Sequence, residues 1–154
     1  MRISVLRLGH RIRRDKRITT HVALVARAFL ADEIVLSGEK DNSVIDSISK
    51  VVKHWGGSFR ASYSKDYIST ILSYRKKGYA ACHLTMKGEP IKKLLPVLQS
   101  KSRILAIVGA EKVPISVYKN SDYNIAITKQ PHSEVGALAV FLNILQNSAP
   151  LEKW

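Results

Sequence analysis

The stretch that decides the fold is residues 102–134, which read SRILAIVGAEKVPISVYKNSDYNIAITKQPHSE. Apolar runs at 103–108 and 123–127 are typical of buried strands, and each run is followed by a polar loop. Because the carboxyl ends of parallel strands lie at one edge of a sheet, the two loops should meet there. Ligands of α/β folds bind at that edge, so we predict that the loops form the floor of an active site.

The whole chain of 154 residues fits one domain, and short β-rich runs alternate with helical patterns along it. This alternation predicts an α/β fold in a single domain, 1–154, with a mostly parallel sheet covered by helices. The predicted strands, all in one sheet, are Ile3–Leu8, Glu33–Ser37, Ser58–Ser62, Tyr79–Leu84, Arg103–Val108 and Tyr123–Ile127. The predicted helices are His21–Leu30 after a Thr20 cap, Asp41–Trp55, Tyr67–Lys77, Pro90–Gln99 and a last helix after Ser133. The tail, 147–154, is expected to fray.

The charge balance points to a polyanionic partner. The chain has 25 Lys and Arg against 12 Asp and Glu, a formal net charge of +13, and clustered cations gain affinity for phosphate through counterion release. No stretch has the apolar length of a spanning helix, so nucleic acid is favoured over membrane and the protein is expected in the cytoplasm. Because Cys82 is the single cysteine and the five histidines are scattered, neither a disulfide nor a metal site is expected.

A basic segment follows the first predicted strand and precedes the first predicted helix. Apart from Asp15, its charged residues are Arg7, Arg11, Arg13, Arg14, Lys16 and Arg17. Guanidinium groups bind phosphate through paired hydrogen bonds and stay charged, so we expect this loop to clamp an RNA or DNA backbone. The alternative is a solvated loop without a ligand, but the net charge and the position after the first strand favour binding.

The two loops of the opening stretch each contain residues suited to a ligand. In Gly109–Pro114, the glycine lets the backbone approach a ligand, and the Glu-Lys pair offers an acceptor and a donor. In Gln130–Glu134, Ser133 is a natural N-cap, and the preceding glutamine and histidine can reach a ligand from the helix N-terminus. Each loop alone also has an ordinary structural explanation, as an exposed turn or a helix cap. Neither a Rossmann glycine turn nor a Walker loop occurs in the sequence.

Several blocks of the chain occur in the order seen in one family. They are 6–11 (LRLGHR), 14–24 (RDKRITTHVAL), 27–29 (RAF), 83–86 (HLTM), 108–114 (VGAEKVP) and 130–135 (QPHSEV). In this combination the chain resembles the archaeal tRNA cytidine-56 2′-O-methyltransferases, a family of the SPOUT superfamily of knotted methyltransferases. The resemblance extends from near the N-terminus to the last helix.

The resemblance implies a C-terminal trefoil knot whose loops bind S-adenosylmethionine. The corresponding cofactor-binding positions are Leu84, Gly109, Ala110, Glu111, Lys112, Val113, Ile127, Thr128, Lys129, Gln130, Pro131, His132, Ser133 and Glu134. Where this chain has Thr128 and Lys129, relatives usually have glycine and asparagine, which leaves the backbone angles of that loop open. For His132 and Glu134, hydrogen bonds that fix the loop are favoured over a role as ligand or base.

The implied reaction is an in-line displacement in which a ribose 2′-oxygen attacks a sulfonium methyl group. In related enzymes an arginine of the first motif is implicated in activating the hydroxyl, and the candidates here are Arg17 and then Arg14. The expected RNA ligands are Arg7, Arg11, Arg13 and Lys16. The resemblance also implies a homodimer. Two alternatives stay open: a knotted methyltransferase that modifies an RNA base, and a non-catalytic RNA-binding protein of the same fold.

Overall fold

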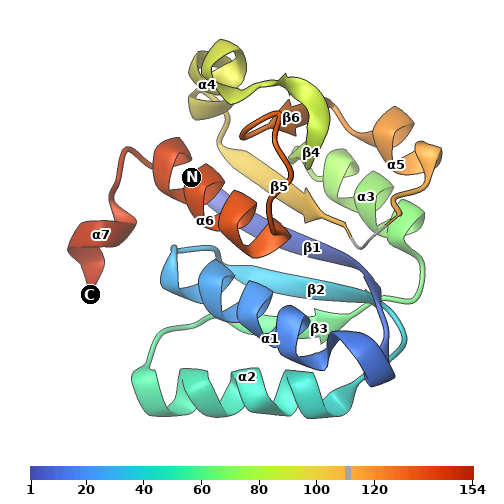
Figure 1. The fold of residues 1–154 in the computed structure, drawn as a ribbon. Coiled ribbons are helices and arrows are strands. Elements are labelled where there is room, and N and C mark those ends of the chain that lie inside the picture. Colours follow the sequence, from blue (N-terminus) through green and yellow to red (C-terminus); the bar gives the residue numbers. More distant parts are fainter. Residues whose placement is uncertain (110–111) are drawn as a thin grey trace.

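The computed structural model describes residues 1–109 and 112–154 (Figure 1). Its elements in chain order are β1 (Arg2–His10), α1 (Ile12–Ala28), β2 (Glu33–Gly38), α2 (Asn42–Trp55), β3 (Arg60–Tyr63), α3 (Tyr67–Lys76), β4 (Ala80–Pro90), α4 (Ile91–Gln99), β5 (Arg103–Val108), α5 (Ile115–Asn120), β6 (Tyr123–Ala126), α6 (Glu134–Leu145) and α7 (Pro150–Lys153). Each of the six predicted strands forms, and β5 begins and ends at the predicted residues.

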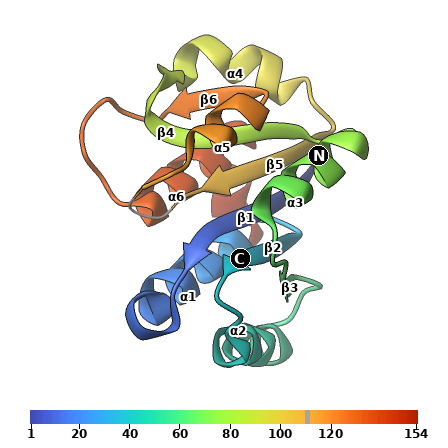
Figure 2. The same cartoon turned by 90° about the vertical axis from the view of Figure 1, so that its right-hand side faces the viewer.

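The strands form one parallel sheet in the order β3-β2-β1-β5-β4-β6, which confirms the predicted fold class. Each ladder is parallel: β1 pairs with β2 and β5, β2 pairs with β3, and β4 pairs with β5 and β6. Between β5 and β6 the chain crosses β4, so that β6 forms the edge beyond it (Figure 2). The carboxyl ends of β4, β5 and β6 therefore share one edge of the sheet, where the opening stretch places its loops.

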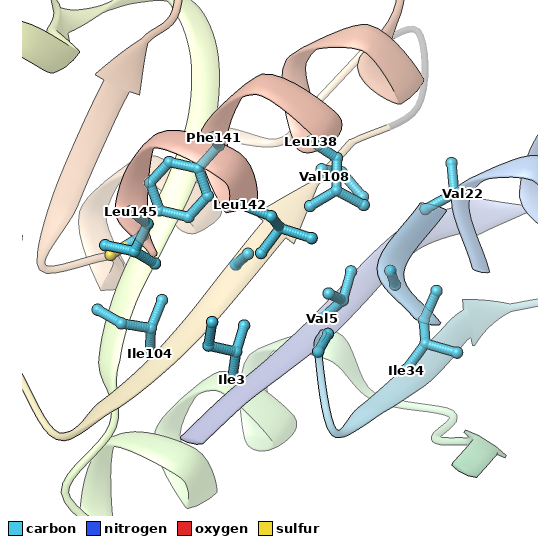
Figure 3. Packing of buried hydrophobic residues seen from close by; sticks show 14 of the residues in the cluster. Ile3, Val5, Val22, Ile34, Ile104, Val108, Leu138, Phe141, Leu142 and Leu145 are labelled. Atoms are coloured by element: carbon cyan, nitrogen blue, oxygen red, sulfur yellow. The ribbon is translucent and has the colours of Figure 1, made fainter. Parts of the chain in front are cut away.

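Helices cover both faces of the sheet. On one face, α1 and α6 bury Val22 and Phe141 against the strands (Figure 3). Ile48 of α2 and Leu98 of α4 belong to the same cluster. On the other face, α3 and α5 contribute Ile71 and Val117 to a second cluster. Residues 104–108 of β5 are at most 1% exposed, because a parallel strand covered on both faces is apolar at nearly every position.

The structure corrects the prediction that the basic segment is a loop, because α1 begins at Ile12 and not at His21. Arginine and lysine are good helix formers, and the Asp15 carboxylate accepts a hydrogen bond of 3.0 Å from the N–H of the N-cap residue Arg11. The Thr20 hydroxyl, predicted as a cap, instead donates within the helix to the carbonyl oxygen four residues earlier at 2.7 Å. The cations therefore project from a helix.

Other segments also differ from the predictions or extend them. β4 continues past Leu84 to Pro90, and the short helices α5 and α7 have no counterpart among the predicted elements, since helices of one or two turns leave little periodic signal. In the tail, Trp154 Nε1 donates to the Ala28 carbonyl oxygen at 2.8 Å, and the Arg27 guanidinium lies over the indole ring. None of the described helices combines the length and the apolar character that crossing a membrane requires.

An irregularity in β4 shapes the sheet edge next to β6. Leu84 and Glu89 both pair with Ile125 of β6, so the residues between them bulge out of the ladder. Gly88 lies in this bulge and packs so closely on β6 that a Cβ would collide with the backbone of Asn124 and Ile125. This close approach requires glycine.

Replacing Gly88 by alanine should destabilise the fold by about 1–3 kcal/mol, the usual cost of overpacking, because the added Cβ pushes β6 away from β4. Gly136→Ala is the matched control, since a Cβ at this exposed position of α6 meets only Ser133 Oγ, at 3.5 Å. Alanine favours a helix over glycine by about 0.5–1 kcal/mol, so the control should be as stable as the wild type or more so. Urea unfolding measures both variants, and a Gly88→Ala chain of wild-type stability would contradict the close approach.

Candidate active site

A cavity of about 550 Å³ opens at the carboxyl ends of β4 and β5, beside the N-terminus of α6. The bulge of β4, the loop after β5 and the loop that leads into α6 provide most of its wall. The lining residues are His83, Leu84, Thr85, Met86, Lys87, Gly109, Lys112, Val113, Tyr118, Gln130, Pro131, His132, Glu134 and Ala137. The volume lies within the range of roughly 300–1,000 Å³ that is typical of small-molecule and cofactor sites.

The structure brings most of the predicted cofactor-binding residues together in this cavity. Those that line it are Leu84, Gly109, Lys112, Val113, Gln130, Pro131, His132 and Glu134. Outside its lining are Ile127, Thr128, Lys129 and Ser133, while Ala110 and Glu111 lie outside the described residues. At Gly109 a Cβ would collide with the side chain of Val113, so any larger residue where the loop leaves β5 would force Val113 to shift.

Thr128 and Lys129, where relatives usually have glycine and asparagine, adopt backbone angles that do not require glycine. Thr128 Oγ1 accepts a hydrogen bond from the Gln130 N–H at 3.1 Å, and Lys129 Nζ donates to the Gly88 carbonyl oxygen at 2.9 Å. Neither Thr128 nor Lys129 has the positive φ that would favour glycine. The threonine closes a local turn, and the lysine ties the loop to the bulge of β4.

The start of α6 is capped as the sequence predicts. Ser133 Oγ accepts a hydrogen bond from the Gly136 N–H at 3.1 Å. The ring of His132 donates from Nδ1 to the Ser133 carbonyl oxygen, also at 3.1 Å. Because His132 lines the cavity as well, its ring both fixes the loop and forms part of the site.

The structure corrects the prediction that Arg7 binds RNA. Arg7 is 1% exposed, and its guanidinium extends from β1 to the two cavity loops. Nη1 donates to the Gly109 carbonyl oxygen at 2.6 Å, and Nη2 forms an ion pair of 3.3 Å with Glu134 Oε1. Burial lowers the pKa of Arg7, while the attraction of Glu134 acts in the opposite direction. The guanidinium therefore holds the two loops together and is not accessible to a phosphate.

His83 is a cavity residue that the sequence reasoning did not assign to the site. Its Nδ1 lies 3.0 Å from Asn124 Oδ1, while Asn124 Nδ2 donates to the Tyr118 carbonyl oxygen at 3.1 Å. Since this orientation makes Oδ1 the acceptor, His83 Nδ1 carries the proton and Nε2 keeps a lone pair. Nε2 is buried without a partner among the described residues, and burial lowers the pKa of His83. The block HLTM at 83–86 was the available sequence signal.

The basic segment forms the first turns of α1, away from the cavity lining. Arg13 and Arg17 are exposed and lie four residues apart on the helix, so they are neighbours on one face. Arg11 and Arg14 both pair with Asp15, at 3.5 and 4.0 Å. Neither Arg14 nor Arg17, the predicted catalytic residues, is among the described residues that line the cavity of the same chain.

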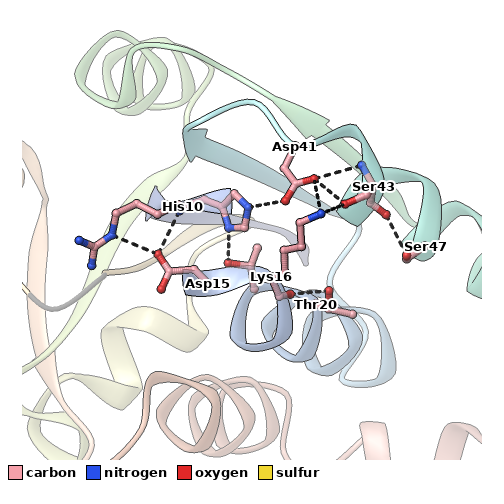
Figure 4. Close-up of polar contacts among 9 residues, drawn as sticks. His10, Asp15, Lys16, Thr20, Asp41, Ser43 and Ser47 are labelled. Atoms are coloured by element: carbon pink, nitrogen blue, oxygen red, sulfur yellow. Dashed lines mark hydrogen bonds and ion pairs between the residues drawn. The ribbon is translucent and has the colours of Figure 1, made fainter. Parts of the chain in front are cut away.

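A buried polar network anchors the start of α1 to α2 (Figure 4). His10 is 1% exposed and lies 2.7 Å from Thr19 Oγ1 through Nδ1 and 2.9 Å from Asp41 Oδ2 through Nε2. Asp41 caps α2 by accepting hydrogen bonds from the Ser43 N–H at 3.2 Å and hydroxyl at 2.6 Å, and Lys16 Nζ lies 3.8 Å from it. Burial acts to raise the pKa of Asp41, but the hydrogen bonds and Lys16 lower it to about 2. Lys16, a predicted RNA ligand, thus has a partner within the chain.

Metal and thiol sites each require a particular arrangement of side chains. Within it, no group of three His, Cys, Asp or Glu side chains is placed to hold a metal ion. Cys82 is buried, and burial raises the pKa of its thiol. A buried thiol with a raised pKa is inert, as its apolar sequence neighbourhood indicates.

The fold is shared with RNA methyltransferases of solved structure. An rRNA methyltransferase from Sinorhizobium meliloti superimposes with a TM-score of 0.73 at 15% identity, over 96% of this chain and 56% of that chain. The SpoU methyltransferase AviRb from Streptomyces viridochromogenes, in complex with AdoMet, gives 0.68 at 14% identity, over 96% and 58%. The A. aeolicus TrmH/SpoU tRNA modifying enzyme gives 0.68 at 11% identity, over 97% and 76%. The protein therefore has the fold of the SpoU and TrmH methyltransferases.

The sequence comparisons narrow this class to one family. The family model described as tRNA ribose 2′-O-methyltransferase, aTrm56, matches residues 55–154. A tRNA (cytidine(56)-2′-O)-methyltransferase of Methanothrix thermoacetophila is 52% identical over 153 residues, which are 99% of this chain and 87% of the relative. The protein of the same name from Methanocaldococcus jannaschii is 51% identical over 148 residues, 94% of this chain and 82% of the relative. The chain belongs to the aTrm56 family of tRNA ribose 2′-O-methyltransferases.

Replacing Asp41 by asparagine should destabilise the fold at neutral pH, because His10 and Lys16 lose their carboxylate partner. The folded pKa of Asp41, about 2, lies below its ordinary value of 3.8. Its ionised form therefore stabilises the fold above pH about 4, and this contribution is lost as the pH falls toward about 2. The wild type and Asp41→Asn should differ in free energy of unfolding at pH 7 and converge on acidification.

The exposed Asp46 on the same helix supplies the control variant, Asp46→Asn, which should stay close to the wild type throughout. Chemical unfolding at several pH values measures all three chains. A difference between the wild type and Asp41→Asn that does not change with pH would show that the ionised carboxylate is not the stabilising group.

Proposed function

We propose that this chain transfers a methyl group from S-adenosylmethionine to the ribose 2′-oxygen of cytidine 56 in the T-loop of tRNA. The observation that carries the proposal is the cavity between the 109–113 and 130–134 loops in a chain of the tRNA ribose 2′-O-methyltransferase family. Relatives of 45–52% identity are named tRNA (cytidine(56)-2′-O)-methyltransferase. Since tRNA is the proposed substrate, we place the protein in the cytoplasm.

The cavity suits the cofactor in size and in the groups that it offers. Its volume of about 550 Å³, the backbone exposed at Gly109 and the unused acceptor of His83 fit an adenosine that carries several donors. The residues we assign to the cofactor are Leu84, Gly109, Ala110, Glu111, Lys112, Val113, Gln130, Pro131, His132 and Glu134, with Ile127, Thr128, Lys129 and Ser133 shaping the second loop. When bound, the cofactor supplies a methyl group on a positively charged sulfur. The trefoil knot that the family implies would run through these loops.

The RNA would bind along the exposed face of α1, with Arg11, Arg13 and Lys16 contacting its backbone. Arg17 would orient a phosphate and the ribose hydroxyl and stabilise the negative charge that develops on the 2′-oxygen, with Arg14 as the second candidate. Arginine stays protonated and is a poor base, so positioning is the role that its chemistry allows. Because neither arginine lines the cavity of its own chain, we propose a homodimer in which α1 of one subunit faces the cavity of its partner.

The test incubates a tRNA transcript with the full chain and labelled S-adenosylmethionine, and maps the methyl group by mass spectrometry. One methyl group on the ribose of cytidine 56 is expected. Arg17→Lys should lower kcat about 100-fold, since lysine keeps the charge but lacks the planar fork of donors. Arg60→Lys is the matched control. Arg60 lies on β3, the edge strand of the sheet that is farthest from β4 and β6, so this variant should keep the wild-type kcat.

Different outcomes separate the alternatives. A methyl group on a base would identify a base methyltransferase, and a chain that binds no S-adenosylmethionine in isothermal titration would be a non-catalytic RNA-binding protein. Either result contradicts the proposed activity. A wild-type kcat in Arg17→Lys would leave the activity intact but exclude Arg17 as the catalytic arginine.

A further inference from the structure

A second cavity, of about 260 Å³, lies at the carboxyl ends of β1 and β2. Two glycine turns form part of its wall. Gly9 and Gly38 have φ values of +66° and +112°, and a Cβ at Gly38 would lie only 2.5 Å from the backbone of His10. Both positions therefore favour glycine, and the strands end in bare backbone at this cavity.

The lining combines apolar surface with positive charge. Leu8, Val113 and the ring of Tyr67 form apolar walls, and Tyr67 is partly buried against the second core cluster. Lys65 and Lys112 are exposed, and neither forms an ion pair with another described residue. The described lining contains no Asp or Glu. Such a site favours a flat, partly apolar group that has negative charge next to it.

Ser37 supplies a hydroxyl group to the wall of the second cavity. The residue is 1% exposed and lines the cavity, and its hydroxyl is not among the described side-chain atoms that are buried without a partner. A hydroxyl in a cavity wall can both donate and accept a hydrogen bond. The hydroxyl therefore marks a position at which a polar group of a ligand can bind.

The second cavity adjoins the cofactor cavity. Lys112 and Val113 line both of them. A methyl transfer requires the acceptor ribose to lie against the methyl donor, so the base attached to that ribose must lie next to the cofactor cavity. The second cavity lies next to the cofactor cavity and is therefore a candidate site for this base.

We propose that the second cavity receives the pyrimidine base of the nucleotide whose ribose is methylated, an inference that rests on the proposed function. Its volume is below the roughly 300–1,000 Å³ of sites for whole small molecules, which suits a single ring. Tyr67 offers a stacking surface, Ser37 a hydroxyl for the polar edge of the base, and Lys65 and Lys112 charges for the flanking phosphates. An enzyme that acts on a stacked nucleotide has to turn it out of the stack, and this cavity would hold the base afterwards.

The experiment compares two tRNAs, one with cytidine at position 56 and one with an abasic ribose there whose 2′-hydroxyl is intact. Tyr67→Ala and Ser37→Ala should each lower kcat/KM at least about tenfold on the cytidine tRNA, through loss of stacking or of a hydrogen bond. Neither should change kcat/KM on the abasic tRNA, because it has no base to place. Tyr67→Phe keeps the ring and should restore activity, and Ser49→Ala on the exposed face of α2 is the matched control.

If the variants lost kcat/KM equally on the two tRNAs, Tyr67 and Ser37 would have a purely structural role. If kcat/KM stayed at the wild-type value on both tRNAs, these residues would not bind the base. Either result overturns the inference.

A second measurement does not depend on methylation: cytidine 5′-monophosphate is titrated at millimolar concentration into the full chain, and the amide resonances of Gly9 and Gly38 are followed by NMR. They should shift in the wild type and not in Tyr67→Ala. Absence of shifts in the wild type overturns the inference, whereas shifts in a chain that methylates no tRNA overturn only the proposed function.

Discussion

The guanidinium of Arg7 extends from an inner strand of the sheet to two loops that are distant in sequence. It donates to the Gly109 carbonyl oxygen at 2.6 Å and pairs with the Glu134 carboxylate at 3.3 Å. Burying the guanidinium costs free energy, which its attraction to a partner offsets only when the contact geometry is good. If the two loops moved away from Arg7, the buried charge would lose its partners, so the contact favours the closed position of the loops. The cavity between β4, β5 and α6 depends on this contact, because both of its loops are fixed by the same side chain.

The sequence predicts the sheet and the positions of the two loops well, because those signals are local. The run 103–108 is apolar at most positions and its strand begins and ends where predicted, and Ser133 caps α6 as its residue type indicates. The role of Arg7 could not be predicted locally, since its partner Gly109 lies 102 positions away and a run of arginines resembles a solvated surface. The basic segment differs from its prediction for a local reason: its charge suggested a loop, whereas its helix propensity and the hydrogen bond to Asp15 favour a helix.

The cofactor cavity, the first turns of α1 and the second cavity differ in the chemical groups that they present. The loops around Gly109 and Glu134 enclose a space with exposed backbone and one unused imidazole acceptor, which suits a neutral heterocycle. The first turns of α1 carry the cations, and the network of His10 and Asp41 fixes their direction relative to the sheet. The second cavity adjoins the first through Lys112 and Val113, and it is the cavity in which we propose that the base of the methylated nucleotide lies.

The measurement that tests the central contact most directly is a double-mutant cycle on S-adenosylmethionine affinity, by isothermal titration of Arg7→Met, Glu134→Gln and the double variant. If the ion pair positions the cofactor loops, each single change should weaken binding at least about tenfold, and the double variant should bind little worse than Arg7→Met. Arg103→Met removes an exposed arginine from β5 and should bind as the wild type does. Wild-type affinity in a folded Arg7→Met chain would contradict the account.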